Sequence, residues 1–196
     1  MKKIIIALLV VFSFGAQAQD YFWSLTWDHS LPMGSTADKI SAYSVRGVGL
    51  DNRWVYNEKY SLGFYMGWHT MYEAKENETS VINNNTTVYG TQYRYINSIP
   101  LALNAHYYFN PHDKVSFYAG LGAGGTWLNY RNEVNLWAII DKGWRFGWYP
   151  EVGLHVPLNR TTKLMAAAKY QNATARKGGD AYSYLSLNFG LSWGFF

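Results

Sequence analysis

Hydrophobic and polar residues alternate along most of this chain, and the segment 181–196 shows the alternation most clearly. Its apolar positions are Leu185, Leu187, Phe189, Leu191, Trp193 and Phe195, and between them stand Ser186, Asn188, Gly190, Ser192 and Gly194. Because successive side chains of a strand point to opposite faces, this period of two predicts a strand with one apolar face. An aromatic-rich apolar face at the end of the sequence is typical of the closing strand of a bacterial outer-membrane barrel.

Seven earlier segments alternate in the same way, so the sequence predicts an all-β fold of eight strands. The predicted strands are 21–31, 44–56, 60–72, 88–109, 115–128, 144–158, 162–172 and 182–195. Short polar turns (57–59, 110–114, 159–161) alternate with longer connections (32–43, 73–87, 129–143, 173–181). Short periplasmic turns and long extracellular loops are the pattern of an antiparallel, up-and-down transmembrane β-barrel. The even number of strands places both termini in the periplasm.

A soluble sandwich or lipocalin-like barrel is the alternative, and in it the apolar face would point inward. Aromatic residues make up 18% of the chain and include nine Trp, which suit interfacial belts better than a small interior. The polar face is rich in glycine, as expected of a crowded lumen: Gly63, Gly67, Gly120, Gly122, Gly124, Gly147, Gly153 and Gly190. These features favour the membrane barrel, which must close because unpaired backbone groups are costly in hydrocarbon.

The N-terminus has the pattern of a cleaved secretory signal peptide, which we assign to residues 1–18. Lys2 and Lys3 precede an apolar run at 4–12, and Ala16-Gln17-Ala18 is a small-x-small cleavage site. A membrane-spanning helix would need ~20 apolar residues, so this run is too short for one. Residues 19–196 then form a single barrel domain. The absence of cysteine excludes disulfides, thiolate metal sites and a lipoprotein anchor.

Charge gives no reason to expect nucleic acid as a partner. The whole chain has a formal net charge of +4, and it has 15 basic and 13 acidic side chains once Lys2 and Lys3 are removed from its 17 basic residues. So small a bias does not indicate a phosphate-binding surface. No nucleic-acid interaction is therefore predicted.

The polar face should fill the barrel lumen with an ionic network. Strand phase and turn length predict that Glu151 lies opposite Lys169, Asp51 opposite Tyr65, and His106 opposite Tyr118. We expect the network to contain Asp51, Tyr65, Arg94, His106, Arg145, Glu151, His155 and Lys169, and Arg53 shares the same face. An eight-stranded barrel is just wide enough for its own side chains, which favours a structural, filled lumen. The alternative is a path for protons or small solutes.

No sequence motif predicts an enzyme, a metal site or a bound cofactor. The five histidines lack zinc-ligand spacing. The G-x-G-x-x-G at 120–125 is followed by strand-like residues rather than by the helix that a phosphate cradle needs. His29 between Asp28 and Ser30 is the one local candidate for a lipid-modifying site. Neighbours in a strand point to opposite faces, so these three residues are poorly placed to cooperate.

The third long connection carries an apolar patch, which we consider a candidate contact surface. It consists of Leu136, Trp137, Ile139 and Ile140. An exposed apolar patch suits a ligand or protein partner. Alternatively, the strands on either side extend beyond the membrane and pack the patch on themselves.

Three segments resemble the small outer-membrane β-barrel proteins of the OmpX/OmpW-like type, especially the versions of Bacteroidota. They are 23–36 (WSLTWDHSLPMGST), 92–109 (QYRYINSIPLALNAHYYF) and 150–158 (PEVGLHVPL). The resemblance implies an eight-stranded barrel in the outer membrane of a Gram-negative bacterium and supplies no catalytic residues. It implies contact with outer-membrane lipid and lipopolysaccharide, insertion by the barrel-assembly machinery, and contact with other outer-membrane proteins.

The expected function is a structural or binding component of the cell envelope, either alone or as a subunit of a larger outer-membrane complex. A narrow conduit for small hydrophobic solutes, as in the OmpW-like branch, is the second hypothesis. A lipid-modifying barrel enzyme is the third.

Overall fold

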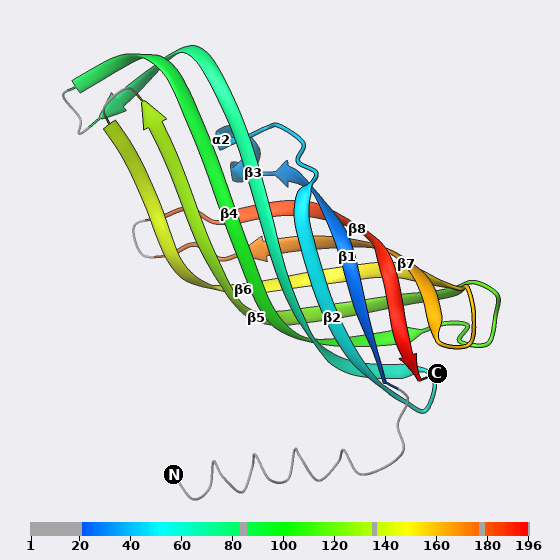
Figure 1. Cartoon of the computed structure of the whole chain (residues 1–196). Helices are drawn as coiled ribbons and strands as arrows, with labels where there is room; N and C mark the ends of the chain where they lie inside the picture. Colours follow the sequence, from blue (N-terminus) through cyan, green and yellow to red (C-terminus); the bar gives the residue numbers. More distant parts are fainter. Residues whose placement is uncertain (1–20, 83–85, 135–136, 177–178, 196) are drawn as a thin grey trace, which may run out of the picture.

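A computed structural model describes residues 21–82, 86–134, 137–176 and 179–195. Eight strands form one closed antiparallel barrel in chain order (Figure 1). They are β1 (Tyr21–Met33), β2 (Arg46–Tyr56), β3 (Tyr60–Ile82), β4 (Thr86–Tyr108), β5 (Ser116–Val134), β6 (Trp137–Pro157), β7 (Thr162–Ala173) and β8 (Tyr182–Phe195), with one short helix, α2 (Ser35–Lys39). The predicted fold class is confirmed. The proposed signal peptide, 1–18, and Leu136 lie outside the described residues.

The alternation of the sequence separates the two faces of the barrel wall. On the outer face, Leu103 is 74% exposed and Leu121 is 65% exposed. Large apolar side chains this exposed are expected on a wall that lipid surrounds. On the inner face, Tyr65 and Lys169 are fully buried. β1 pairs with β8 along its whole length, beginning with Tyr21 opposite Phe195. The first and last strands are therefore hydrogen-bonded neighbours, and the barrel closes at this seam without an unpaired strand edge. Among the described residues, no helix is long and apolar enough to cross a membrane.

The turns at the periplasmic end set the strand register. Tyr56 pairs with Tyr60 across a three-residue turn, 57–59, in which Asn57 and Glu58 both have positive φ, 49° and 58°. This turn places Asp51 opposite Tyr65, and the β6–β7 hairpin places Glu151 opposite Lys169, which confirms both predicted registers.

The predicted register of the β4–β5 hairpin is wrong. Tyr108, not His106, lies opposite Tyr118, and His106 faces Gly120. The Asn110 side chain donates to the Val115 carbonyl (2.7 Å) and accepts from the Phe117 amide (2.8 Å). Phe109 therefore bonds to the Phe117 carbonyl (2.9 Å), two residues beyond the partner that the predicted turn gives, and the register moves by two. His106 and Tyr118 still touch as diagonal neighbours, with ring centroids 5.4 Å apart.

Two of the predicted long loops are strands. β3 and β4 each have 23 residues and remain paired up to Ile82 opposite Thr86, while β5 and β6 remain paired up to Val134 opposite Trp137. The pairing of β3 with β2 ends at Thr70, and the pairing of β6 with β7 begins at Gly147. The four strands therefore continue past the barrel as a projecting sheet, formed by β3 after residue 70, its partners on β4 and β5, and β6 before residue 147 (Figure 1).

Candidate functional site

Arg53 of β2 lies at the centre of an ionic network that crosses the lumen. Its guanidinium donates to Asp51 Oδ2 (2.8 Å) and Glu151 Oε1 (2.9 Å), and the side chain is fully buried. Arg53 thus bridges carboxylates from β2 and β6 on opposite sides of the barrel. Sequence reasoning placed Arg53 on the lumen face but left it out of the network. Its position between the two carboxylates depends on cross-barrel distances that strand register does not give.

Lys169 supplies the second positive charge of this network. Its ammonium lies 3.8 Å from both Asp51 Oδ2 and Glu151 Oε2, and 3.6 Å from the centroid of the Tyr65 ring. Two cations thus face two carboxylates in a fully buried cluster. Burying any one of these charges without its partners would cost several kcal/mol.

Aromatic rings fill the lumen around the ions. Tyr118 donates to Glu151 Oε1 (2.8 Å), and His106 Nε2 lies 3.2 Å from Glu151 Oε2. His155 stacks on Tyr118 with centroids 5.0 Å apart. The tyrosine rings pack directly against glycine residues, which leave space for them. A Cβ at Gly153 would lie 2.5 Å from Tyr118, and one at Gly122 would lie 2.2 Å from Tyr149. The middle of the lumen is therefore packed with side chains.

Three possible metal ligands converge in this network. Single ligand atoms of Asp51, His106 and Glu151 all lie within 4.8 Å of one another. However, Arg53 and Lys169 already contact both carboxylates. A metal ion would be placed beside two fixed positive charges, so the arrangement fits an ion-pair network rather than a metal site.

A second polar cluster combines Asp28, Ser30, Tyr65 and His69. Ser30 Oγ lies 3.3 Å from His69 Nδ1, and Tyr65 donates to Asp28 Oδ2 (3.1 Å). This serine–histidine–aspartate set was missed because the sequence search considered only neighbouring residues. All four side chains are buried. His29, the histidine named from sequence, lies on the outer wall with Trp27 and Tyr43, away from Asp28 and Ser30, as strand parity requires.

Arg94 and Arg145 do not join the central network, contrary to the expectation from sequence. Arg145 donates to Asp141 (2.6 Å) and to the Asp180 carbonyl (2.7 Å). Arg94 donates to Gln92, to Glu78 and to the Lys39 carbonyl. The two arginines lie at the extracellular end of the lumen, where the loops and the projecting sheet supply closer partners.

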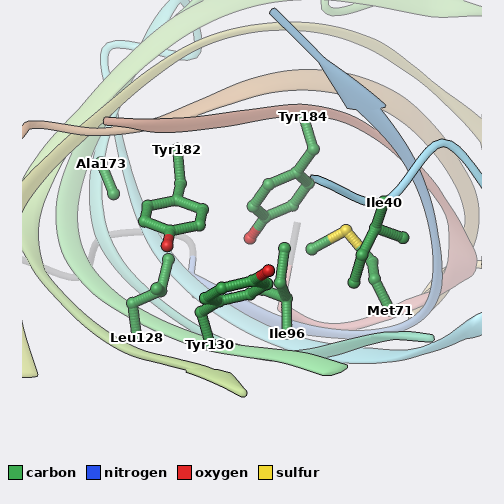
Figure 2. Packing of buried hydrophobic residues seen from close by; sticks show 8 residues of the cluster. All are labelled: Ile40, Met71, Ile96, Leu128, Tyr130, Ala173, Tyr182 and Tyr184. Atoms are coloured by element: carbon green, nitrogen blue, oxygen red, sulfur yellow. The ribbon is translucent and has the colours of Figure 1, made fainter. Parts of the chain in front are cut away.

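The extracellular mouth of the lumen is apolar, which the sequence analysis did not predict. We call the following residues the mouth cluster: Ile40, Met71, Ile96, Leu128, Tyr130, Ala173, Tyr182 and Tyr184 (Figure 2). All but Ile40 belong to strands. The available signal was the break in alternation at Met71, Ile96 and Leu128, which are apolar at lumen-facing positions.

At the periplasmic end, the lumen opens into a hollow of about 310 Å³. Its lining is Phe22, Val55, Glu58, Tyr108, Pro111, His112, Ser116, His155 and Lys163. His155 is one of the residues that stack with the central network, so the hollow reaches the packed middle of the lumen.

The predicted apolar patch lies on β6 in the projecting sheet. Trp137 is 51% exposed, Ile139 42% and Ile140 51%. In the strand pairing, Trp137, Ile139 and Ile140 lie opposite Val134, Asn132 and Arg131 of β5. Because side chains alternate along a strand, Ile140 points to the other side of the sheet from Trp137 and Ile139. The strands do extend beyond the barrel, as the alternative interpretation expected, yet they leave these side chains exposed.

Comparison with known proteins identifies the family. A model described as "Outer membrane protein beta-barrel domain" matches residues 4–195. The chain belongs to this family. It is therefore a protein of the Gram-negative outer membrane, and lipid and lipopolysaccharide form its surroundings. The comparison with curated proteins gives no match.

Solved structures share the fold at low sequence identity. Neisserial surface protein A (NspA) has a TM-score of 0.55 at 13% identity, over 90% of this chain and 97% of its own. The outer membrane protein OprG from Pseudomonas aeruginosa has a TM-score of 0.55 at 12% identity, over 91% and 96%. Ail, the attachment invasion locus protein of Yersinia pestis, solved with the heparin analogue sucrose octasulfate, has a TM-score of 0.52 at 14% identity, over 90% and 99%. At such identities the likeness concerns the fold alone.

Proposed function

We propose that this protein is a non-enzymatic binding component of the outer-membrane surface, whose lumen network serves to hold the barrel together. The observation that carries the proposal is the projecting sheet, an exposed apolar and aromatic surface outside the membrane. We further propose that its partner is another outer-membrane protein, so that the barrel is a subunit of a larger complex, and that the barrel-assembly machinery inserts it.

Two features of the projecting sheet support a protein partner. Beyond Thr70, β3 has no strand pairing with β2, so this edge of the described sheet is unpaired. Before Gly147, β6 has no strand pairing with β7, and its edge is partly covered, since the Phe146 and Lys142 carbonyls accept from Thr174 and Arg176. Unpaired edges accept an additional strand from another protein. Tyr89 (65% exposed), Trp137 and Ile140 add large side chains that bind well when they are buried in an interface.

Site-specific crosslinking on intact cells tests this role. A photoreactive amino acid at Trp137 or Ile140 is expected to crosslink to a discrete protein, because these side chains stand outside the membrane. Leu103 is the matched control, because it is also well exposed but lies on the lipid-facing wall. Adducts that contain only lipid at all three positions would contradict the proposed partner.

The conduit for small solutes is the second candidate, favoured by the apolar mouth cluster and by the periplasmic hollow. The ion-pair network and its rings lie between these two features and fill the lumen. We therefore expect no sustained unitary current from the purified protein in a planar bilayer. Sustained currents would show that the packed middle of the lumen opens.

A further inference from the structure

The connection between β1 and β2, residues 34–45, lies across the extracellular mouth, and we call it the mouth strap. We propose that the mouth strap is a gate: it swings away from the barrel as a unit and exposes the mouth cluster to the outside. This inference is independent of the role of the projecting sheet.

Ile40 is the side chain with which the mouth strap closes the extracellular mouth. It is fully buried and is the only member of the mouth cluster that does not come from a strand (Figure 2). The remaining members, which include Met71, Ile96 and Leu128, are lumen-facing wall residues. Withdrawal of the strap, which carries Ile40 and the partly buried Ala42 away from the cluster, would therefore expose apolar side chains that stay fixed in the barrel wall.

The backbone of the mouth strap is only weakly joined to the wall. In the described part of the chain, backbone-to-backbone hydrogen bonds connect it to the barrel only at Ser44, whose amide and carbonyl pair with Ser30. The amides of Ala37 and Ile40 bond within the strap, to Gly34 and Thr36. The strap can therefore move without breaking the strand pairing of the barrel. Local opening of this kind costs less than global unfolding.

The two ends of the mouth strap suit a hinge. At one end stands Gly34, whose φ of +53° lies in the left-handed region that favours glycine. At the other end is the Ser30–Ser44 bridge, the last backbone connection before β2 begins at Arg46.

Lys39 clasps the strap to the opposite rim of the barrel. Its ammonium pairs with Asp180, lies 3.3 Å from the Tyr182 hydroxyl, and is 4.8 Å from the ring centroids of both Tyr130 and Tyr182. The pairing with Lys39 also lowers the pKa of the Asp180 carboxyl. Asp180 is 63% exposed, so water competes for the ion pair and the clasp can be released.

Side-chain contacts supply the other attachments. Thr36 Oγ1 accepts from the Ser183 amide (2.8 Å), Arg94 donates to the Lys39 carbonyl (2.9 Å), and Ser41 donates to Glu73 (2.8 Å). Ser41 also donates its amide to Glu73 (2.7 Å), and Ser35 Oγ donates to the Ala181 carbonyl (2.8 Å). All of these are side-chain hydrogen bonds at the rim, and water can replace them once the strap lifts. The closed state thus depends on Ile40 burial and on a set of individually weak contacts.

Cysteine accessibility tests the gate, because the chain has no cysteine of its own. Met71→Cys places a reporter in the mouth cluster, and Ala173→Cys is a second reporter that changes the packing little. The full chain in lipid vesicles is treated with an uncharged maleimide. We expect slow labelling of either reporter, accelerated about tenfold by Lys39→Met, since an ion pair and cation–π contacts are together worth about that factor.

The controls separate gating from misfolding. Lys59→Met removes an exposed lysine from a periplasmic turn and should leave the labelling rate unchanged. Heat-dependent gel migration verifies that each variant is folded, and Asp180→Asn replaces Lys39→Met if the latter fails. Equal labelling rates with and without the clasp would overturn the gate. So would a reporter that is labelled as fast as a cysteine at exposed Lys114, since the mouth would then never be closed.

Discussion

Replacement of Arg53 by methionine is expected to lower the free energy of unfolding by about 3–5 kcal/mol, the usual cost of removing one partner from a buried ion pair. Methionine fills much of the same volume but leaves Lys169 as the one cation of the network beside Asp51 and Glu151, with its ammonium 3.8 Å from each carboxylate. Tyr118 and Tyr108 also lose a contact, since the guanidinium lies 3.3 and 3.4 Å from their hydroxyls. The network would keep two negative charges and one positive charge inside a closed wall.

Unfolding by urea in lipid vesicles, followed by tryptophan fluorescence and by gel migration, measures this effect. Arg160→Met is the matched control, because Arg160 is exposed in the β6–β7 turn. A loss below about 1 kcal/mol for Arg53→Met, comparable with an exposed pair, would mean that water reaches the network. The lumen would then not be sealed, and the conduit would become the better-supported function.

Local alternation was enough to predict the barrel and its inner and outer faces. The registers that place Asp51 opposite Tyr65 and Glu151 opposite Lys169 followed from strand phase and short turns. Contacts across the barrel did not follow. The position of Arg53 between two carboxylates depends on barrel diameter and on side-chain reach, and neither is encoded in a period of two.

The extracellular half was harder to predict, for two physical reasons. The Asn- and Glu-rich composition of residues 73–87 is typical of a solvated loop, yet strand pairing continues outside the membrane because the hydrogen-bond ladder does not depend on lipid. Ile40 stands in a segment without periodicity, so no pattern indicates that it is buried. In the β4–β5 turn, a side-chain cap by Asn110 moved the register, an interaction that turn length does not reveal.

The closing seam offers the second large expected effect, because Gly190 of β8 has no space for a side chain. It lies opposite Thr26 of β1, and an added Cβ would be 2.0 Å from the Leu25 carbonyl oxygen and 2.7 Å from Thr26 Cα. These are backbone atoms of β1, so the clash can be relieved only if β1 and β8 move apart. We expect Gly190→Ala to cost about 3 kcal/mol, at the upper end of the usual range for overpacking.

Gly125→Ala is the matched control for this substitution. A Cβ there would meet only ring atoms of Trp144, at 3.2 Å, and that side chain can shift within the lipid-facing wall. Urea midpoints and the fraction of heat-shifted protein should therefore fall for Gly190→Ala and change little for Gly125→Ala. An equal loss of stability in both variants would show that the clash with the β1 backbone does not explain the effect, because Gly→Ala in a strand is by itself slightly stabilising.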